Sequence, residues 1–378
     1  MLSVDHPENL RNLLRNLINI YSPTGKEQEI AGFLHRYLKG GGLPVRLQNI
    51  DKDRVNLLVI PPKTDILAVM VGHVDTVAAY DLDQFGCREE DDVIEGLGAS
   101  DMKGGCAAMI EAYLAFWKER RCFPPVALAL VSGEEEEGDG TQRLVKEYHF
   151  PWAIIGEPSG LHPCFSNYGY FEIQITTTGK RKHASLANPG QNPVEAMLRL
   201  LIRISRALTE NRPEVVYNIR DLSSSRSGFA VPERCDVWLD LHLPSSAPLG
   251  EIIVELEDIV AGEGRENPDF NGTLSFINVH GGYDLPEKGQ IPETLKKVYD
   301  ELQLPWEPQA FRSHSDANLL WASGIKPVIL GPGGLEQAHS PDEFVSFEQV
   351  LLASKIYYAL LVSLCEQIHR NKAGEFPP

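Results

Sequence analysis

The chain has 378 residues and a formal net charge of −18, with 43% hydrophobic and 23% charged residues. This length predicts about two domains. The acidic balance, without any Lys/Arg-rich run, argues against nucleic acid or an anionic membrane as a partner, and no apolar run approaches the ~20 residues of a membrane span.

Both ends of the chain show the pattern of an α/β domain. Helical spacing of apolar residues predicts helices at about 10–18, 27–38, 104–118 and 347–369. Short, continuous apolar runs bounded by glycine or proline suit buried strands. These runs are 55–60, 66–71, 126–131, 152–155 and 328–330. Strands separated by helices predict an α/β fold with a mixed, mostly parallel sheet and flanking helices.

The middle of the chain has a different pattern. Alternating apolar and polar residues predict strands at about 170–178, 235–243 and 273–279. Helices are expected at 192–208, where Pro193 takes the tolerated first position, and at 249–260. This order resembles β-α-β-β-α-β and predicts an inserted α+β domain at 166–284, between the two parts of the α/β domain, 1–165 and 285–378.

Acidic and histidine-bearing motifs follow four of the buried strand candidates. His73 and Asp75 follow the run at 66–71, and the carboxylates of Glu134–Glu137 follow the run at 126–131. Glu157 and His339 come after the runs at 152–155 and 328–330. Because ligands bind at the carboxyl ends of strands in open α/β sheets, these four segments are expected to converge on one rim.

The residue types suit a metal site. Histidine and carboxylates bind zinc and other first-row divalent ions. Asp75 stands where its carboxylate can accept the second ring N–H of His73 and so fix the tautomer. Asp101, in GLGASDMKGG at the mouth of a helix, can bridge two cations.

Each motif also has a simpler interpretation. His73 and Asp75 can be a packed pair, and Asp101 can be a helix N-cap. The glutamate run can be a solvated loop, although it directly follows a buried strand, where like charges repel unless something positive neutralises them. The segments around Glu157 and His339 can be plain turns.

Six motifs in chain order resemble the two-metal amidohydrolase and peptidase family that includes acetylornithine deacetylase, succinyl-diaminopimelate desuccinylase, aminoacylase and glutamate carboxypeptidase. The motifs are GHVDTV, GLGASDMKGG, SGEEEEGDGT, GEPSG, KHASLANPGQNP and GPGGLEQAHSPDEF. Together they span nearly the whole chain. The resemblance implies a zinc-exopeptidase-like catalytic, metal-binding domain at 1–165 and 285–378, with a lid and dimerisation domain at 166–284.

The resemblance implies five metal ligands. His73 and Glu157 would be the terminal ligands of one ion, and Glu135 and His339 those of the other. Asp101 would bridge both ions. It also implies a cis peptide bond between Asp101 and Met102.

Three further residues would take part in catalysis, according to the same resemblance. Glu134 would be the general base and Asp75 would orient His73. His183 would stabilise the oxyanion, in dimeric members by reaching the partner's active site. The residues leave open whether Glu134 and Glu135 or Glu135 and Glu136 act as base and ligand; the family spacing of the ligand to a following glycine, here Gly140, favours the first pair.

The chain departs from the family pattern around the substrate. His242 stands in LDLHLP where relatives often have arginine, Phe229 stands in SGFAVP where many have asparagine, and Leu97 replaces a residue that is usually arginine or aromatic. The first two changes bear on how a substrate carboxylate would be held. The ligand residues are unaffected.

The function implied is metal-dependent hydrolysis of the amide bond of an N-acyl amino acid, as in acetylornithine deacetylase, by a metal-activated water with a glutamate base. The cofactors would be two divalent metal ions, zinc first, with cobalt or manganese as alternatives. A dipeptidase or carboxypeptidase acting on small peptides is the alternative enzyme. Outside active enzymes, an inactive relative that binds metal or ligand is disfavoured because every ligand and the base are present, and an acidic interaction protein would bind no stoichiometric divalent ion.

The expected partners are small molecules. An N-acyl amino acid or small peptide is the predicted substrate, without nucleic acid or membrane, and a homodimer would form through the lid domain. The start, MLSVDHPENLRNLL, lacks the basic and apolar regions of a signal peptide and predicts a cytoplasmic location. Six cysteines at irregular spacings, without a CxxC pair, predict reduced thiols.

Overall fold

The structure, a computed structural model, describes residues 7–62, 65–187, 191–226 and 228–374. The chain forms two compact units, and each has its own sheet and helices. The first unit contains the residues up to Phe165, Leu285–Phe311 and the residues from Ser315 onward. The second contains Ser166–Asp284 and, unexpectedly from the sequence, Arg312–His314.

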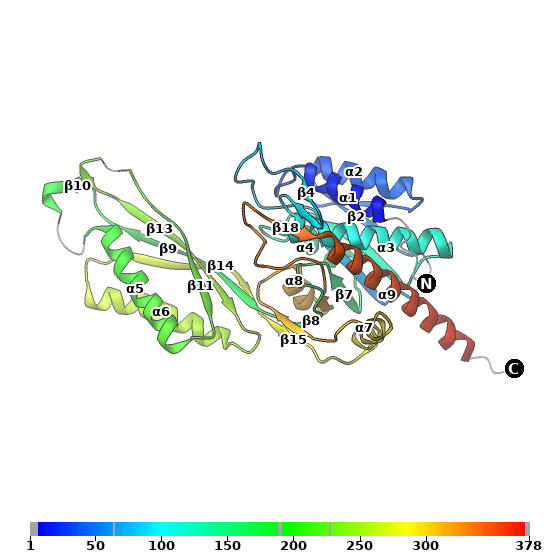
Figure 1. Ribbon diagram of the computed structural model, residues 1–378. Coiled ribbons are helices and arrows are strands. Elements are labelled where there is room, and N and C mark those ends of the chain that lie inside the picture. The colour runs from blue at the N-terminus through cyan, green and yellow to red at the C-terminus, as the bar shows by residue number, and fades with distance from the viewer. Residues whose placement is uncertain (1–6, 63–64, 188–190, 227, 375–378) are drawn as a thin grey trace. The chain divides into compact units, whose positions relative to one another are not determined.

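The first unit is built on a mixed sheet (Figure 1). Its strands are β1 (Arg46–Asn49), β2 (Val55–Val59), β3 (Ala68–His73), β6 (Val126–Val131), β7 (Trp152–Ile155), β8 (Cys164–Asn167), β16 (Gln309–Phe311) and β17 (Lys326–Ile329). The order is β1-β2-β6-β3-β7-β17-β8, and β16 also pairs with β8. The pairs β6–β3, β3–β7 and β7–β17 are parallel, whereas β1–β2, β2–β6 and β17–β8 are antiparallel. The predicted mixed α/β fold is confirmed, with parallel pairing confined to the centre.

Helices flank this sheet in two groups. The helices of this unit are α1 (Pro7–Asn19), α2 (Gln28–Gly40), α3 (Gly104–Arg120), α4 (Asp139–Glu147), α7 (Gln290–Glu301), α8 (Asp316–Ala322) and α9 (Phe347–Gly374). α3 packs against α1 and α9 and contacts β3 and β6, while α4 and α8 pack together. Every residue of β3, β6 and β7 is buried, which is typical of strands covered on both faces.

Helix α9 is both long and apolar. Among the described helices it is the one whose segment Phe347–Arg370 has the length and composition of a membrane span. However, 61% of its apolar window is buried inside the fold, as in a core helix.

A small antiparallel sheet carries the segment that leads into α3. It consists of β4 (Arg88–Glu90), β5 (Val93–Glu95) and β18 (Phe344–Ser346) in the order β18-β5-β4. An irregular helical turn, Ala99–Lys103, connects β5 to α3. Within this turn the Asp101–Met102 peptide bond is cis, as the family resemblance predicts.

The second unit is an α+β unit with a four-stranded antiparallel sheet. Its order is β11 (Val216–Ser224), β13 (Arg234–Leu243), β9 (Gly169–Thr178) and β14 (Gly272–His280). Helices α5 (Pro193–Asn211) and α6 (Leu249–Glu266) pack on one face, where β9 and β13 bury their alternate residues. Short strands β10 (Lys182–His183) and β12 (Ala230–Val231) pair beside this sheet, and β15 (Tyr283–Asp284) pairs with Ser166 and Asn167.

Candidate metal centre

The strand ends bring the predicted ligands together. His73 is the last residue of β3, and β6 and β7 end shortly before Glu135 and Glu157. These strands are parallel neighbours, so their carboxyl ends share one edge of the sheet. The loop after β17 carries His339, and the irregular turn before α3 carries Asp101. All five residues belong to the first unit.

The five side chains form two clusters that share Asp101. In the first, His73 Nε2 lies 3.1 Å from Asp101 Oδ1 and 3.7 Å from Glu157 Oε1. In the second, His339 Nε2 lies 3.4 Å from Asp101 Oδ2 and 2.9 Å from Glu135 Oε2. In each cluster three potential ligand atoms lie within 4.8 Å of one another. Asp101 thus presents one oxygen to each cluster, as a bridging carboxylate would.

Polar atoms in these clusters lack partners within the described part of the chain. Glu135 Oε1 and Glu157 Oε1 are buried and make no hydrogen bond there. A buried carboxylate oxygen without a hydrogen-bond partner is costly unless a cation compensates it. Histidine nitrogens and carboxylate oxygens are the donors that zinc, cobalt and manganese accept. The residues therefore fit two divalent cations.

The pKa shifts of the clustered residues follow from their burial and from the charges close to them. Burial raises the pKa of Glu135 and of Glu157, with the Asp101 charge adding to both shifts. Hydrogen bonds to Asp101 and Glu135 raise the pKa of His339 to about 11. Without metal, protons on the histidines would partly neutralise the carboxylates, so protons and metal ions compete for these atoms.

Glu134 lies beside the clusters. It belongs to neither ligand group, and its Oε2 is 3.8 Å from His73 Nε2. Burial raises its pKa, His73 opposes the shift, and the charges of Asp316 and Glu135 add to it. Glu136 is exposed. This geometry favours Glu134 as the base and Glu135 as the ligand over the alternative, in which Glu135 and Glu136 take these roles.

Asp75 makes a different contact from the one expected. His73 Nδ1 lies 3.1 Å from the backbone oxygen of Asp75, while the carboxylate Oδ1 is 3.7 Å away. The carboxylate instead accepts hydrogen bonds from the backbone N–H groups of Gly133, Glu134 and Glu135. The expectation of a carboxylate–imidazole hydrogen bond is thus corrected: the backbone oxygen takes that place.

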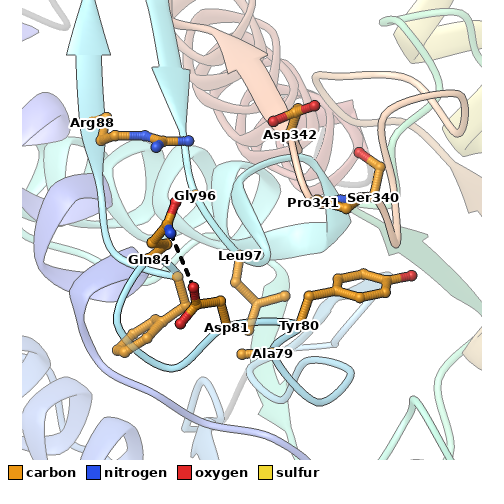
Figure 2. Close-up of a pocket in the computed structure, with 11 residues that line it drawn as sticks. Ala79, Tyr80, Asp81, Gln84, Arg88, Gly96, Leu97, Ser340, Pro341 and Asp342 are labelled. Carbon is orange, nitrogen blue, oxygen red and sulfur yellow. Dashed lines mark hydrogen bonds between the residues drawn. The ribbon is translucent and has the colours of Figure 1, made fainter.

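His339 is held in an unusual backbone conformation. Its φ is 57°, which few residues other than glycine adopt and which recurs at functional sites. The Tyr80 hydroxyl donates to its backbone oxygen at 3.1 Å. Figure 2 shows the adjoining pocket, in which Tyr80 and Leu97 lie opposite Arg88 and Asp342.

Two buried acids near the clusters were not predicted from the sequence. Asp316, at the start of α8, has a buried Oδ1 without a hydrogen-bond partner in the described chain, and burial raises its pKa to about 7. Glu343, four residues after His339, is buried as well. Both stand in motifs, SDA and SPDE, that look like ordinary helix-start or turn sequences, so only their burial distinguishes them.

His183, the other predicted catalytic residue, belongs to the second unit. It is exposed on β10, and its Nδ1 lies 2.8 Å from the Ser185 hydroxyl. In the same unit His242 lies on β13, with its ring centroid 5.3 Å from that of Tyr170. The contacts described above lie within the first unit and do not involve His183, so its catalytic role stays a prediction.

The sequence pattern of peptidase family M20/M25/M40 matches residues 69–363, which includes both clusters. The chain belongs to this family. This M20-family chain is 26% identical over 334 residues to acetylornithine deacetylase from Pasteurella multocida, covering 83% of this chain and 85% of the relative. It is a metallohydrolase that acts on linear amide or peptide bonds, as the resemblance implied.

Solved structures share the fold of this M20-family chain. A tripeptidase from Staphylococcus aureus superposes with a TM-score of 0.79 at 19% identity, covering 95% of this chain and 98% of that one. A dinuclear metal-binding M20 peptidase from Bacillus subtilis superposes with a TM-score of 0.67 at 13% identity, covering 95% and 98%. At these identities the likeness establishes the fold.

Proposed function

We propose that this M20-family hydrolase cleaves the amide bond of a small N-acyl amino acid at a centre of two divalent metal ions. One observation carries the proposal: Asp101 directs Oδ1 toward His73 and Oδ2 toward His339. A carboxylate shared by two ligand groups can bridge a pair of ions. Zinc is the proposed metal, because a mixed histidine and carboxylate set suits it, and cobalt and manganese accept the same donors.

The ligand residues divide into two sets with Asp101 in common. His73 and Glu157 would hold one ion, and Glu135 and His339 would hold the other. Bound there, the ions would supply a lowered pKa for a coordinated water molecule and polarisation of the scissile carbonyl.

Glu134 supplies the proton transfers. Its carboxylate lies beside His73 without joining either ligand set. We assign it to accept the proton of the attacking water and to return it to the leaving amine. Without metal, burial raises the pKa of this carboxyl.

Similarity at low identity favours the deacylase assignment. The acetylornithine deacetylase relative matches along 83% of this chain. The pocket of Figure 2 offers such a substrate apolar contacts from Phe85, Leu97 and Pro341, next to the segment that carries His339. The tripeptidase fold favours the second candidate, a peptidase acting on small peptides.

The second unit would serve as lid and dimerisation domain, and the first as catalytic domain. Exposed aliphatic side chains lie on α5, at Leu198 and Ile202, and on the outermost strand β11, at Val216, Ile219 and Leu222. An apolar helix surface and an open strand edge in one unit suit pairing with a second copy.

In that dimer His183 would act in catalysis as an oxyanion donor. A cytoplasmic location accords with small metabolites as substrates.

Hydrolysis assays test the proposal. The protein, stripped of metal and reloaded with zinc, cobalt or manganese, is assayed against N-acyl amino acids, dipeptides and tripeptides. We expect amine release from N-acyl amino acids only after metal is added. Hydrolysis of peptides alone would favour the second candidate, and the absence of metal-dependent hydrolysis of any amide would refute both.

A further inference from the structure

Glu343 lies against the backbone that carries Asp101. Its side chain is buried, with 2% of the residue surface exposed. Its Oε1 accepts hydrogen bonds from the backbone N–H groups of Ser100 and Asp101, and its Oε2 accepts one from Gly98, all at 2.9 Å. One carboxylate therefore satisfies three backbone donors immediately before and at the shared residue of the two clusters.

The main chain of Glu343 holds the same segment from a second side. Its carbonyl accepts the N–H of Gly96 at 2.9 Å, next to the β18–β5 pair in which Phe344 lies opposite Glu95. The segment 96–101 is thus attached to Glu343 by both backbone and side chain. His339 stands four residues earlier in the same stretch, so one short segment carries a ligand of one cluster and the support of the ligand common to both.

Packing around Gly98 also restricts the segment. A Cβ built on Gly98 would lie 2.7 Å from Thr76 Cγ2 and 3.1 Å from the Lys103 side chain. Lys103 itself is buried, and its ammonium donates to the Ile20 carbonyl at 2.9 Å. The loop before Asp101 therefore has little room to shift, and the Glu343 carboxylate supplies the acceptors for three of its backbone N–H groups.

The chemistry of this contact requires a carboxylate. Two acceptor oxygens can serve three N–H donors, whereas a carboxamide has one acceptor oxygen and an NH2 group that would face a donor. Hydrogen bonds to an ionised acceptor are also stronger than those to a neutral one.

We propose that Glu343 is a positioning residue for Asp101. By holding the backbone at Gly98, Ser100 and Asp101, it sets the direction in which the Asp101 oxygens face His73 and His339. This inference rests on the proposed two-metal function. Groups that orient a metal ligand typically change metal affinity or activity by about 10- to 100-fold when they are removed.

The test compares Glu343→Gln, Glu343→Asp and the control Glu348→Gln with the wild type. Glu348 is exposed near the start of α9, so its substitution changes charge equally without touching the segment 96–101. Each protein is stripped of metal and titrated with Co²⁺ by visible absorption, well below its unfolding temperature measured by circular dichroism. Kinetics with the best substrate from the panel follow.

We expect Glu343→Gln to bind Co²⁺ about 10- to 100-fold more weakly and to lose kcat to a similar extent. KM should change by less than about threefold, because the buried Glu343 side chain offers almost no surface to a substrate. Glu343→Asp keeps both oxygens but reaches less far, so its Co²⁺ affinity should be intermediate. Glu348→Gln should match the wild type. A purely structural role would lower the unfolding temperature without this loss of affinity.

Wild-type Co²⁺ affinity in folded Glu343→Gln overturns the inference. If that variant does not fold, wild-type affinity and kcat in Glu343→Asp overturn it equally. A wild-type protein that binds no Co²⁺ and hydrolyses no amide would overturn the proposed function, and this inference with it. A wild type that behaves as proposed, with unaffected Glu343 variants, removes only the role of Glu343.

Discussion

The Nδ1 atom of His73 lies closer to the backbone oxygen of Asp75, at 3.1 Å, than to the Asp75 carboxylate, at 3.7 Å. The backbone oxygen can accept the Nδ1 proton and leave Nε2 free for a metal ion. The carboxylate is then available for another task, which is to hold the N–H groups of Gly133, Glu134 and Glu135. Asp75 therefore connects the histidine of one cluster to the glutamates that follow β6.

The first prediction follows from this contact. Asp75→Asn should lower kcat and metal affinity by about 10- to 100-fold, because the loop that presents Glu134 and Glu135 loses its charged acceptor. Thr24→Val removes only the hydroxyl that donates to Asp75 Oδ2 at 2.8 Å, so its effect on stability should be about 1 kcal/mol. Metal analysis, kinetics and thermal unfolding measure both variants. Full activity in Asp75→Asn would contradict this role.

The second prediction separates the two adjacent glutamates. Glu134→Gln should lower kcat by about 10²- to 10⁴-fold and keep its metal, since a general base is not a ligand. Glu135→Gln should lose metal as well, because Glu135 Oε2 lies 2.9 Å from His339 Nε2 in the second cluster. Elemental analysis of the two purified variants checks the difference. Equal metal loss in both would contradict the division, and Glu136→Gln serves as the control on an exposed neighbour.

The continuous apolar runs were sufficient to predict the strands that position the site. Runs at 66–71, 126–131 and 152–155 became β3, β6 and β7, because a strand buried on both faces must be apolar throughout. The three-residue strands β5 and β18 carry no such signal, so the pairing that brings Glu343 to the Asp101 loop could not be predicted. The spacing of His73 and Asp75 likewise cannot decide whether a backbone or a carboxylate oxygen meets the ring.

The third prediction concerns metal removal and pH. In the metal-free protein burial raises the pKa of Glu134 and of Glu157 above their usual 4.5, and contacts with Asp101 and Glu135 raise that of His339 to about 11. The folded state then binds more protons than the unfolded state between about pH 5 and 7, so its stability should fall as pH rises. The shift of Asp101 acts the other way, but its usual pKa of 3.8 places that effect below this window. Burial lowers the pKa of His242 and of His280, which opposes the trend within the window, whereas burial raises the pKa of Asp316 and of Glu343 to about 7 and adds to it.

Thermal unfolding with chelator and with added zinc measures this effect. Ions that bind the folded state replace those protons, so the gain in Tm on adding zinc should grow from pH 5 to pH 7. Glu134→Gln lacks one of the raised carboxyls and should show a flatter pH dependence without metal. A metal-free protein whose Tm rises through this window would contradict the prediction.

The last prediction concerns His183, which is exposed on β10 beside Phe229, a residue with 90% of its surface exposed. If this surface serves the active site of a partner copy, His183→Ala should lower kcat at least about 100-fold, as the loss of an oxyanion donor does, with unchanged metal content. Ser185→Ala is the control, because it removes only the hydroxyl near His183 Nδ1.

Mixing His183→Ala with Glu134→Gln should restore part of the activity after subunit exchange, since a mixed dimer contains one site with both residues intact. No recovery after proven exchange would assign His183 to its own chain or to no catalytic role, and a monomer by light scattering would exclude the exchange between copies altogether.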